Sequence, residues 1–432
     1  MNEHGLAVRV VIPTRNRVDS LWRTLASLAR QTFPVDQFEV VVVDDGSQDS
    51  TARLTANFAA PFRLTVRTAE RPAGAAAARN LGAAGAATPL LLFLDDDIEA
   101  APGLVEAHVR AHAAGAQVTI GYLPVAVSVG RGFFPIALRG WWESMFASMR
   151  QPGHRYTFRD LLTGNCAIAA ELFHGTGGFD PSLACHEDYE LGVRLIECEA
   201  RFQFVEKARG LHHERTTLQR ALDRKRAEGR ADVQILSRHP HLWPVLPMGF
   251  LEERSGRRQR ALRRLALSAP PGSRLAERGL RAGLRLHEAI RRRGRWGVTL
   301  DHVLGLAYWQ GVSAAAGGHE GFRELRARAA AERPSPHDEL EVDVAAGLAD
   351  GMRRVDEQRP PALTVRYRGE LVGRLPAMPG AEALRGIHLQ SALARDLSPG
   401  FLRALGRIGA ARLEFRHRPI ATGPLPAAEL NL

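Results

Sequence analysis

The sequence predicts an α/β fold, a mostly parallel sheet with helices on both faces, and two observations support this prediction. Short apolar runs typical of buried strands alternate with segments of helical spacing along the N-terminal part of the chain. Three of those runs end in polar or acidic residues, as strands do when their carboxyl ends form a ligand site. The convergence of three such ends predicts one site at one edge of the sheet.

Four runs rich in Val, Leu, Ile and Phe are predicted to be the strands of this sheet. Turn-forming residues such as Gly, Asp, Asn and Pro bound them. In chain order the runs are residues 8–14, 38–43, 62–68 and 89–94.

Three segments between these runs are predicted to be helices. Leu21, Leu25 and Leu28 recur at helical spacing, and Asp19 or Ser20 suits the N-cap of that helix. Strands that alternate with helices pair in parallel, because each crossover returns the chain to the same edge of the sheet. The three helices are residues 19–31, 50–58 and 73–87, the last made mostly of small residues.

The rest of the chain changes character twice. Residues 254–295 hold fourteen arginines and only two acids, with leucines spaced as in amphipathic helices. Residues 330–340, with prolines and acids, are predicted to be a linker. We therefore predict a large α/β domain, a basic helical extension and a small α+β module, at residues 1–245, 246–330 and 341–432.

Further elements are predicted inside these regions from local pattern. The expected strands are 161–170, 201–205, 363–367 and 371–375, and the expected helices are 186–199, 300–315 and about 381–395.

The composition restricts the compartment and the partners. The formal net charge is +11 and the pI is near 10.5, which favours phosphorylated substrates, an anionic membrane surface or nucleic acid as neighbours. The three cysteines form no C-x-x-C pair, which fits a reducing cytosol. No signal peptide is recognised and no run of about 18 apolar residues occurs. We expect a cytoplasmic protein, with peripheral contact at the inner face of the membrane.

The acidic cluster Asp95-Asp96-Asp97 directly follows the fourth apolar run. Its D-x-D spacing puts the first and third carboxylates on one face of the chain. Carboxylate oxygens are the hard ligands that Mg²⁺ or Mn²⁺ prefers, and such an ion stabilises the charge of a diphosphate leaving group. A solvated acidic turn is the alternative, and the buried strand before the cluster argues against it. We predict Asp97 and Asp95 as metal ligands, with Asp96 beside them at the substrate.

Two other strand ends are predicted to bind a nucleotide. Pro13, Thr14 and Arg15 end the first strand, and Asp44 and Asp45 end the second. A carboxylate there can accept a hydrogen bond from the N–H of a base or from ribose hydroxyls. The alternative is that the aspartates cap the helix that follows them.

The acid–base candidates open a predicted helix. A carboxylate at a helix N-terminus is stabilised as the anion, so Asp188 suits a general base, whereas Glu187 is predicted to cap the helix or bind substrate. Thr163, Gly164 and Asn165 are predicted to line the substrate pocket.

Three basic side chains are candidate partners of the acids. Arg79, on the small-residue helix, is predicted to pair with a phosphate or to fix an aspartate of the cluster, the alternative being an ordinary surface arginine. His212 or His213, after a predicted strand, would complete the shell of the metal.

Several motifs in their order and spacing resemble the family-2 glycosyltransferases of GT-A fold, over residues 8 to about 215. The matching segments are VVIPTRNR (10–17), VVVDDGSQDST (41–51), AAARNLG (76–82), FLDDDI (93–98), TGNCAIA (163–169), GGFDPSL (177–183) and HEDYELGVRL (186–195).

The resemblance implies an inverting, metal-dependent transfer of a sugar from a nucleoside diphosphate sugar, expected to be UDP-linked, to a hydroxyl acceptor on a glycan or glycolipid. Members of this family commonly act in cell-envelope polysaccharide or glycolipid assembly, and the resemblance implies the same for this chain. The roles implied are base and ribose binding by Thr14, Asp44 and Asp45, diphosphate contact by Arg79, the D-x-D pair Asp95 and Asp97, the base Asp188, and a metal-binding His212 or His213.

One departure from the family bears on the product. Processive members carry a Q-x-x-R-W motif after the base, and although Gln219 and Arg220 lie in that region the motif is absent. We therefore expect a non-processive enzyme.

Two other classes of function remain as alternatives. A sugar-nucleotide nucleotidyltransferase would need a glycine-rich loop after the first strand, and the sequence has none there. A non-catalytic basic protein would bind membrane or nucleic acid through residues 254–295, but the aromatic interleaving typical of single-strand binding is missing, so nucleic acid is not an expected partner.

Overall fold

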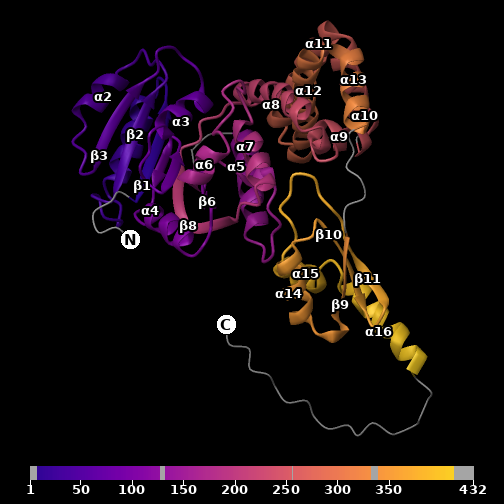
Figure 1. Ribbon diagram of the computed structural model, residues 1–432. Helices are drawn as coiled ribbons and strands as arrows, with labels where there is room; N and C mark the ends of the chain where they lie inside the picture. Colours follow the sequence, from indigo (N-terminus) through magenta and orange to yellow (C-terminus); the bar gives the residue numbers. More distant parts are fainter. Residues whose placement is uncertain (1–6, 127–131, 255, 332–338, 413–432) are drawn as a thin grey trace. The chain divides into compact units, whose positions relative to one another are not determined.

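The structure is a computed structural model that describes residues 7–126, 132–254, 256–331 and 339–412 (Figure 1). It contains two compact units, one of residues 1–337 with 378–383 and one of the remaining C-terminal residues. Most of the predicted linker at 330–340 lies outside the described residues. The basic helices fall in the first unit, and their separation as a domain of their own stays a prediction.

The first unit is built on an eight-stranded sheet of order β3-β2-β1-β4-β7-β6-β8-β5. The first four strands in this order are parallel, and β7 is antiparallel to both of its neighbours. The strands are β1 (Val8–Thr14), β2 (Phe38–Asp44), β3 (Arg63–Thr68), β4 (Leu90–Leu94), β5 (Ile98–Ala100), β6 (Val118–Tyr122), β7 (Asn165–Ala169) and β8 (Phe202–His212). The predicted α/β class, a mostly parallel sheet with helices on both faces, is confirmed.

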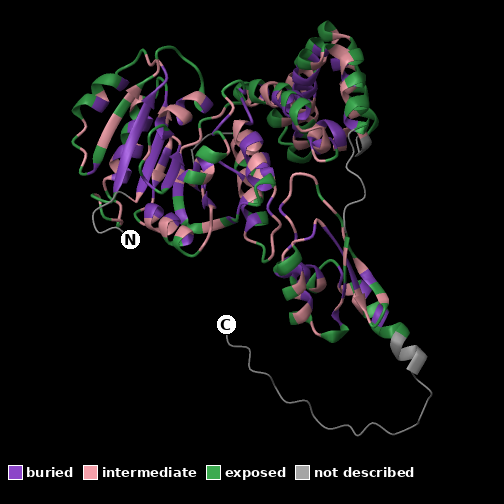
Figure 2. Ribbon diagram, viewed as in Figure 1, coloured by how far each residue is buried: buried purple, intermediate pink, exposed green. Residues whose placement is uncertain are grey.

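Helices cover both faces of this sheet because side chains alternate along each strand. Val41 and Val43 pack with Ala78 of α3, whereas Val40 and Val42 belong to the main core with the leucines of α1. Strands β1, β2 and β4 are almost wholly buried, as their purple colour in Figure 2 shows. The helices here are α1 (Val18–Leu28), α2 (Thr51–Asn57), α3 (Ala75–Ala83), α4 (Leu104–Ala113), α5 (Phe133–Met149), α6 (Ala170–Gly175) and α7 (Glu187–Glu197).

Two strands differ from the prediction in ways that affect the site. The strand expected at 161–170 begins only at Asn165, so Thr163 and Gly164 lie in the turn before β7. The strand expected at 201–205 continues to His212, because its second half pairs with the short strand β5, where His212 lies opposite Ile98. The extension therefore brings His212 beside the end of β4.

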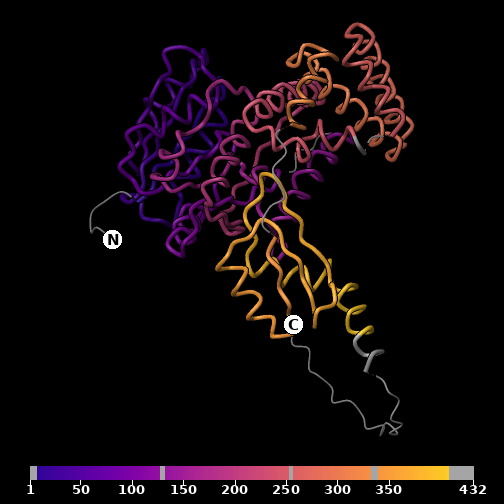
Figure 3. The backbone as a smooth tube through the Cα atoms, turned by 45° about the vertical axis from the view of Figure 1, so that its right-hand side comes forward, coloured from indigo at the N-terminus to yellow at the C-terminus, as the bar shows by residue number. Residues whose placement is uncertain are grey.

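The arginine-rich region is helical, as predicted. The helices of this part of the chain gather around α8, which precedes the arginine-rich region, and around α12 (Figures 1 and 3). Apolar residues of α8, α10, α12 and α13 share one core with Phe158 and Val193. The helices are α8 (Leu218–Arg238), α9 (Pro247–Arg254), α10 (Arg257–Ser268), α11 (Pro270–Ala289), α12 (Arg293–Ala316) and α13 (Gly318–Ala331). Among the described residues, no helix combines the length and apolar character needed to cross a membrane.

Helices α8 and α12 approach so closely that only glycine fits at their contact. A Cβ atom on Gly229 would lie 2.2 Å from the carbonyl oxygen of Tyr308, and one on Gly311 would lie 2.0 Å from that of Arg226. These distances are far shorter than a van der Waals contact, so the two glycines fix the spacing of the helices.

The second unit is the small α+β module predicted at the C-terminus. Its sheet has the order β11-β10-β9, with β10 parallel to β9 and antiparallel to β11. Its elements are β9 (Glu339–Asp343), α14 (Leu348–Gln358), β10 (Ala362–Tyr367), β11 (Glu370–Leu375), α15 (Gly386–Ala394) and α16 (Ser398–Arg412).

The glycine contact gives a stability prediction. We expect Gly311→Ala to lower the free energy of unfolding by about 1–3 kcal/mol, because the added methyl group forces α8 and α12 apart. Gly305→Ala, on the same helix, is the matched control, since nothing lies within 4 Å of its Cβ position. That variant should gain about 0.5–1 kcal/mol from helix propensity. Urea unfolding of both variants measures the difference, and equal stabilities would contradict the assigned packing.

Candidate functional site

The site begins where β1, β2 and β4 end, at the edge where parallel strands present ligands. Thr14 and Asp44 are opposite each other in the register of β1 and β2. The turns after these two strands are tied together, since the Asn16 amide oxygen accepts a hydrogen bond from Gln48 N–H at 2.7 Å. Asn16 adopts a left-handed φ of 54°, a conformation that asparagine tolerates. The three predicted strand ends therefore form one edge.

The two aspartates that end β2 serve the turns rather than a helix cap. The Asp44 carboxylate accepts a hydrogen bond from Ser47 N–H at 2.8 Å. Asp45 accepts one from Ala73 N–H at 2.7 Å and one from Gly74 N–H at 3.1 Å, just before α3. Helix α2 starts later, after Ser50, so neither aspartate caps it. Asp45 thus attaches the loop before α3 to the site.

The central carboxylate of the D-x-D cluster has a structural position. Asp96 is buried and accepts hydrogen bonds from the Thr14 hydroxyl at 2.7 Å and from Arg17 Nη1 at 2.9 Å. Burial raises its pKa to about 6, against the opposing effects of Arg17 and Thr14. Asp96 therefore joins the end of β4 to the end of β1.

The third carboxylate faces a histidine. One oxygen of Asp97 accepts a hydrogen bond from Arg17 at 2.9 Å, and the other lies 3.7 Å from Nε2 of His212. Burial opposes ionisation of Asp97, yet His212 and Arg17 hold its pKa below the usual value. Burial would lower the pKa of His212, but the carboxylates of Asp97 and Glu214 raise it. Of the two candidate histidines, only His212 turns to Asp97, since His213 bonds to Glu99 at 3.0 Å.

The geometry of Asp97 and His212 fits a divalent cation. A separation of 3.7 Å is too long for a hydrogen bond. It suits two ligands that each lie about 2.0–2.2 Å from one ion. Within the described part of the chain, no group of three or more His, Cys, Asp or Glu side chains could hold a metal. The remaining ligands would therefore be water or oxygens of the substrate, as is usual for Mg²⁺.

The first carboxylate of the cluster binds a buried arginine. Arg79 Nη2 lies 2.8 Å from Asp95, and its Nη1 lies 2.7 Å from Glu187 at the start of α7. Burial would lower the pKa of Arg79, but these two carboxylates raise it. Of the roles predicted for Arg79, the fixing of an aspartate is the one that the contacts of the structure match. Glu187 is engaged in the same bridge.

Asp188 lies next to this bridge and is unusually basic. Burial, together with the neighbouring Glu187 carboxylate, raises its pKa to about 6. One of its oxygens accepts a hydrogen bond from Tyr189 N–H at 2.9 Å. A carboxyl group with such a pKa accepts a proton readily near neutral pH.

A buried network that the sequence did not reveal supports the start of α7. His186 has a left-handed φ of 59°, and its Nδ1 lies 2.8 Å from Asp232 on α8. The second oxygen of Asp232 accepts a hydrogen bond from the Tyr308 hydroxyl on α12 at 2.7 Å. The helical region therefore holds the residue that precedes Glu187 and Asp188. No sequence pattern links these positions, because they are far apart in the chain.

The residues predicted to line a pocket before β7 occupy different places. Gly164 lies against Asp95, since a Cβ there would be 3.2 Å from an Asp95 oxygen. Thr163 is buried. Asn165 is fully buried, donates to Ala208 O at 2.8 Å and lies 3.0 Å from His108 Nε2, so its side chain lies within the sheet.

An open polar pocket of about 620 Å³ lies beside Asp97. Of the residues in its walls, Arg15, Asp97 and His213 were expected from the sequence, whereas Arg17 and Arg215 were not. The walls carry four arginines and four carboxylates, so the arginines can face an anionic ligand while the carboxylates can face a cation. These residues are Arg15, Arg17, Arg215 and Arg220, with Asp19, Asp49, Asp97 and Glu214. The RNR sequence after β1 was the signal for Arg17, whereas nothing local marked Arg215.

The family model "Glycosyl transferase family 2" matches residues 9–175. Among curated relatives, validoxylamine A glucosyltransferase of Streptomyces hygroscopicus is 37% identical over 218 residues, which is 44% of this chain and 52% of that protein. Pre-mycofactocin glycosyltransferase of Mycobacterium tuberculosis is 29% identical over 242 residues, 54% of this chain and 48% of that protein. The chain thus spans about half the length of these relatives.

A solved structure, the mannosyltransferase PcManGT from Pyrobaculum calidifontis in complex with GDP-Man and Mn²⁺, is similar at a lower level. It is 18% identical, with a TM-score of 0.47, and the match covers 71% of this chain and 88% of that one. The likeness concerns the fold alone.

Proposed function

We propose that the protein transfers a sugar from a nucleoside diphosphate sugar to a hydroxyl acceptor, with a divalent metal ion and with inversion. The match of residues 9–175 to the model of glycosyl transferase family 2 supports this proposal. The observation that carries the proposal is the position of Asp97, which faces His212 and borders a polar pocket with four arginines. The ion pairs of Arg79 with Asp95 and Glu187 connect this acidic cluster to the start of the helix that carries Asp188. The family match also favours glycosyl transfer over the nucleotidyl transfer considered above.

The donor would lie along the edge of β1, β2 and β4. Thr14, Asp44 and Asp45 would border the base and ribose, and the arginines of the pocket beside Asp97 would face the diphosphate. Asp97 and His212 would hold Mn²⁺ or Mg²⁺, which would supply positive charge to the leaving group. We propose UDP as the nucleotide, as the resemblance implied.

The transfer would proceed in one displacement. The Asp188 carboxylate takes the proton of the acceptor hydroxyl as its oxygen bonds to C1 of the sugar. The bond from C1 to the phosphate oxygen breaks, and its electron pair leaves with the nucleoside diphosphate. Arg79 forms ion pairs with Asp95 and Glu187. Of these three neighbouring carboxylates, Asp188 is therefore the one that has no arginine at hydrogen-bond distance.

The relatives are named for different acceptors, validoxylamine A and pre-mycofactocin. We therefore propose the acceptor only as a hydroxyl compound. From the resemblance to the family, we propose a place in cell-envelope polysaccharide or glycolipid assembly. We propose non-processive transfer because the Q-x-x-R-W motif is absent. Product analysis with candidate acceptors would test both, since repeated additions to one acceptor would contradict the second.

Two substitutions separate binding from chemistry. We expect Asp97→Ala to abolish the Mn²⁺-dependent rise in thermal stability given by a nucleoside diphosphate, because the ion loses a ligand. Asp188→Asn should keep that rise and reduce transfer by about 10²-fold or more, the scale for a lost general base. Ligand at 100 times its dissociation constant stabilises by about 2.7 kcal/mol, so the shift is readily measured. Full turnover by Asp188→Asn would place the base elsewhere.

The pKa of Asp188 gives a pH dependence. A base must be ionised, and the raised pKa of about 6 keeps Asp188 protonated at more acidic pH. We expect kcat/KM to fall about tenfold per pH unit below about pH 6 and to level off above it. Nucleotide binding measured over the same range is the control for loss of folding or of the metal. A rate that stays constant down to pH 5 while binding persists would contradict the assignment.

We also propose peripheral contact with an anionic membrane. Leu275 and Leu286 of α11 expose 69% and 58% of their surface among arginines, a composition that suits an anionic lipid interface. We expect co-sedimentation with vesicles that contain phosphatidylglycerol and none with pure phosphatidylcholine, and weaker co-sedimentation after Leu275→Asn with Leu286→Asn. Equal binding to both vesicles, or none, would reject the contact.

A further inference from the structure

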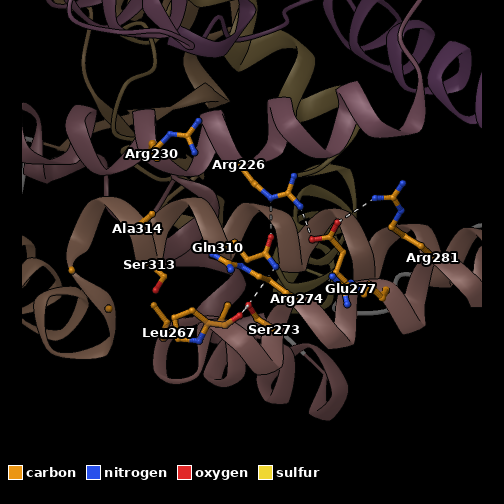
Figure 4. A pocket seen from close by; sticks show the side chains of 15 residues that line it. Arg226, Arg230, Leu267, Ser273, Arg274, Glu277, Arg281, Gln310, Ser313 and Ala314 are labelled. Atoms are coloured by element: carbon orange, nitrogen blue, oxygen red, sulfur yellow. Dashed lines mark hydrogen bonds and ion pairs between the residues drawn. The ribbon is translucent and has the colours of Figure 1, made fainter.

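The helical region contains a basic pocket, of about 700 Å³, between α8, α11 and α12 (Figure 4). Five guanidinium groups and one carboxylate line it. They belong to Arg226 and Arg230 of α8 and to Arg274, Glu277, Arg278 and Arg281 of α11.

The single carboxylate neutralises only part of this charge. Glu277 is buried and pairs with Arg226 at 2.5 Å and with Arg281 at 3.7 Å. Within the described residues, Arg230, Arg274 and Arg278 form no ion pair with a carboxylate. Three exposed guanidinium groups around one hollow repel one another, so an anion bound there would relieve an existing electrostatic cost.

Uncharged residues of the pocket orient one of its arginines. Gln310 of α12 accepts a hydrogen bond from Arg226 Nε at 2.9 Å and lies 3.4 Å from the Ser273 hydroxyl. Figure 4 shows Arg226 between Gln310 and Glu277, which orients its guanidinium group. Ser313, from the next turn of α12, adds a hydroxyl group. The position of α12 against α8 is itself fixed by the two contact glycines, so the pocket is preformed.

We propose that this pocket binds a phosphate-bearing anion, a phosphomonoester or diphosphate group, at a site separate from the donor site. Guanidinium groups match phosphate oxygens in pairs, and a phosphomonoester carries a charge of about −1.5 to −2 at neutral pH. The ligand is a soluble phosphate compound or the headgroup of a phospholipid. The proposal does not rest on the transferase activity, because it concerns residues that take no part in the assigned site.

The test measures inorganic pyrophosphate binding by calorimetry to the full chain in metal-free buffer, where the donor site lacks its ion. We expect Arg274→Gln with Arg278→Gln to weaken the binding on the order of 100-fold, about tenfold for each guanidinium group removed. Arg292→Gln with Arg293→Gln removes the same charge from exposed positions outside the pocket and should change the affinity less than about twofold. Thermal unfolding of both variants checks that they fold.

A second arm identifies the source of the phosphate. The same proteins are sedimented with phosphatidylcholine vesicles that contain phosphatidic acid. Pyrophosphate binding that is weakened on the order of 100-fold only in the Arg274 and Arg278 variant, without vesicle binding by any of the proteins, supports a soluble ligand. Vesicle binding that is weakened only in that variant supports a headgroup. Absence of both kinds of binding, or equal weakening in the two variants, would overturn the proposal. Neither result depends on Asp97 or Asp188, so failure here leaves the proposed transfer intact.

Discussion

The site depends on one buried guanidinium group. Arg79 pairs with Asp95 at the end of β4 and with Glu187 at the start of α7, so it sets the distance between the acidic cluster and the helix that carries Asp188. Without that positive charge, the carboxylates of Asp95, Glu187 and Asp188 would repel one another in a partly dehydrated space. The arginine therefore allows these three carboxylates to lie within one small region.

The three adjacent aspartates contact different partners. Asp95 is bound to Arg79, Asp96 is buried against Thr14 and Arg17, and only Asp97 has an oxygen that faces His212. Asp96 and Asp97 lie in the turn between β4 and β5, so the alternation of a strand does not continue through the cluster, and Arg17 contacts both of them. The central residue fastens β4 to β1 through Thr14.

The strands of the parallel half could be predicted because their signal is local. Continuous apolar runs gave β1, β2 and β4 to within a residue, and polar ends gave the edge at which the site lies. The full length of β8 could not be predicted. Its last residues form a strand because they pair with the three-residue strand β5, which is far away in the sequence. For the same reason, only the structure shows that His212 faces Asp97 and that His213 bonds to Glu99. Asn165 looked like a pocket residue in its motif, and only its distant neighbours His108 and Ala208 show that its amide is used inside the sheet.

The hydrogen bond from Tyr308 to Asp232 shows that the start of α7 depends on helices outside the residues that the family model matches. Asp232 holds His186, the residue that opens the helix of Asp188, and shares its other oxygen with a tyrosine from a helix that the family model does not include. A shortened chain that ends near residue 245 would keep Asp232 but leave one carboxylate oxygen without its buried donor. The family model ends at residue 175, before α7, whereas the start of α7 is held by residues of α8 and α12, so those later helices are part of the scaffold of the site.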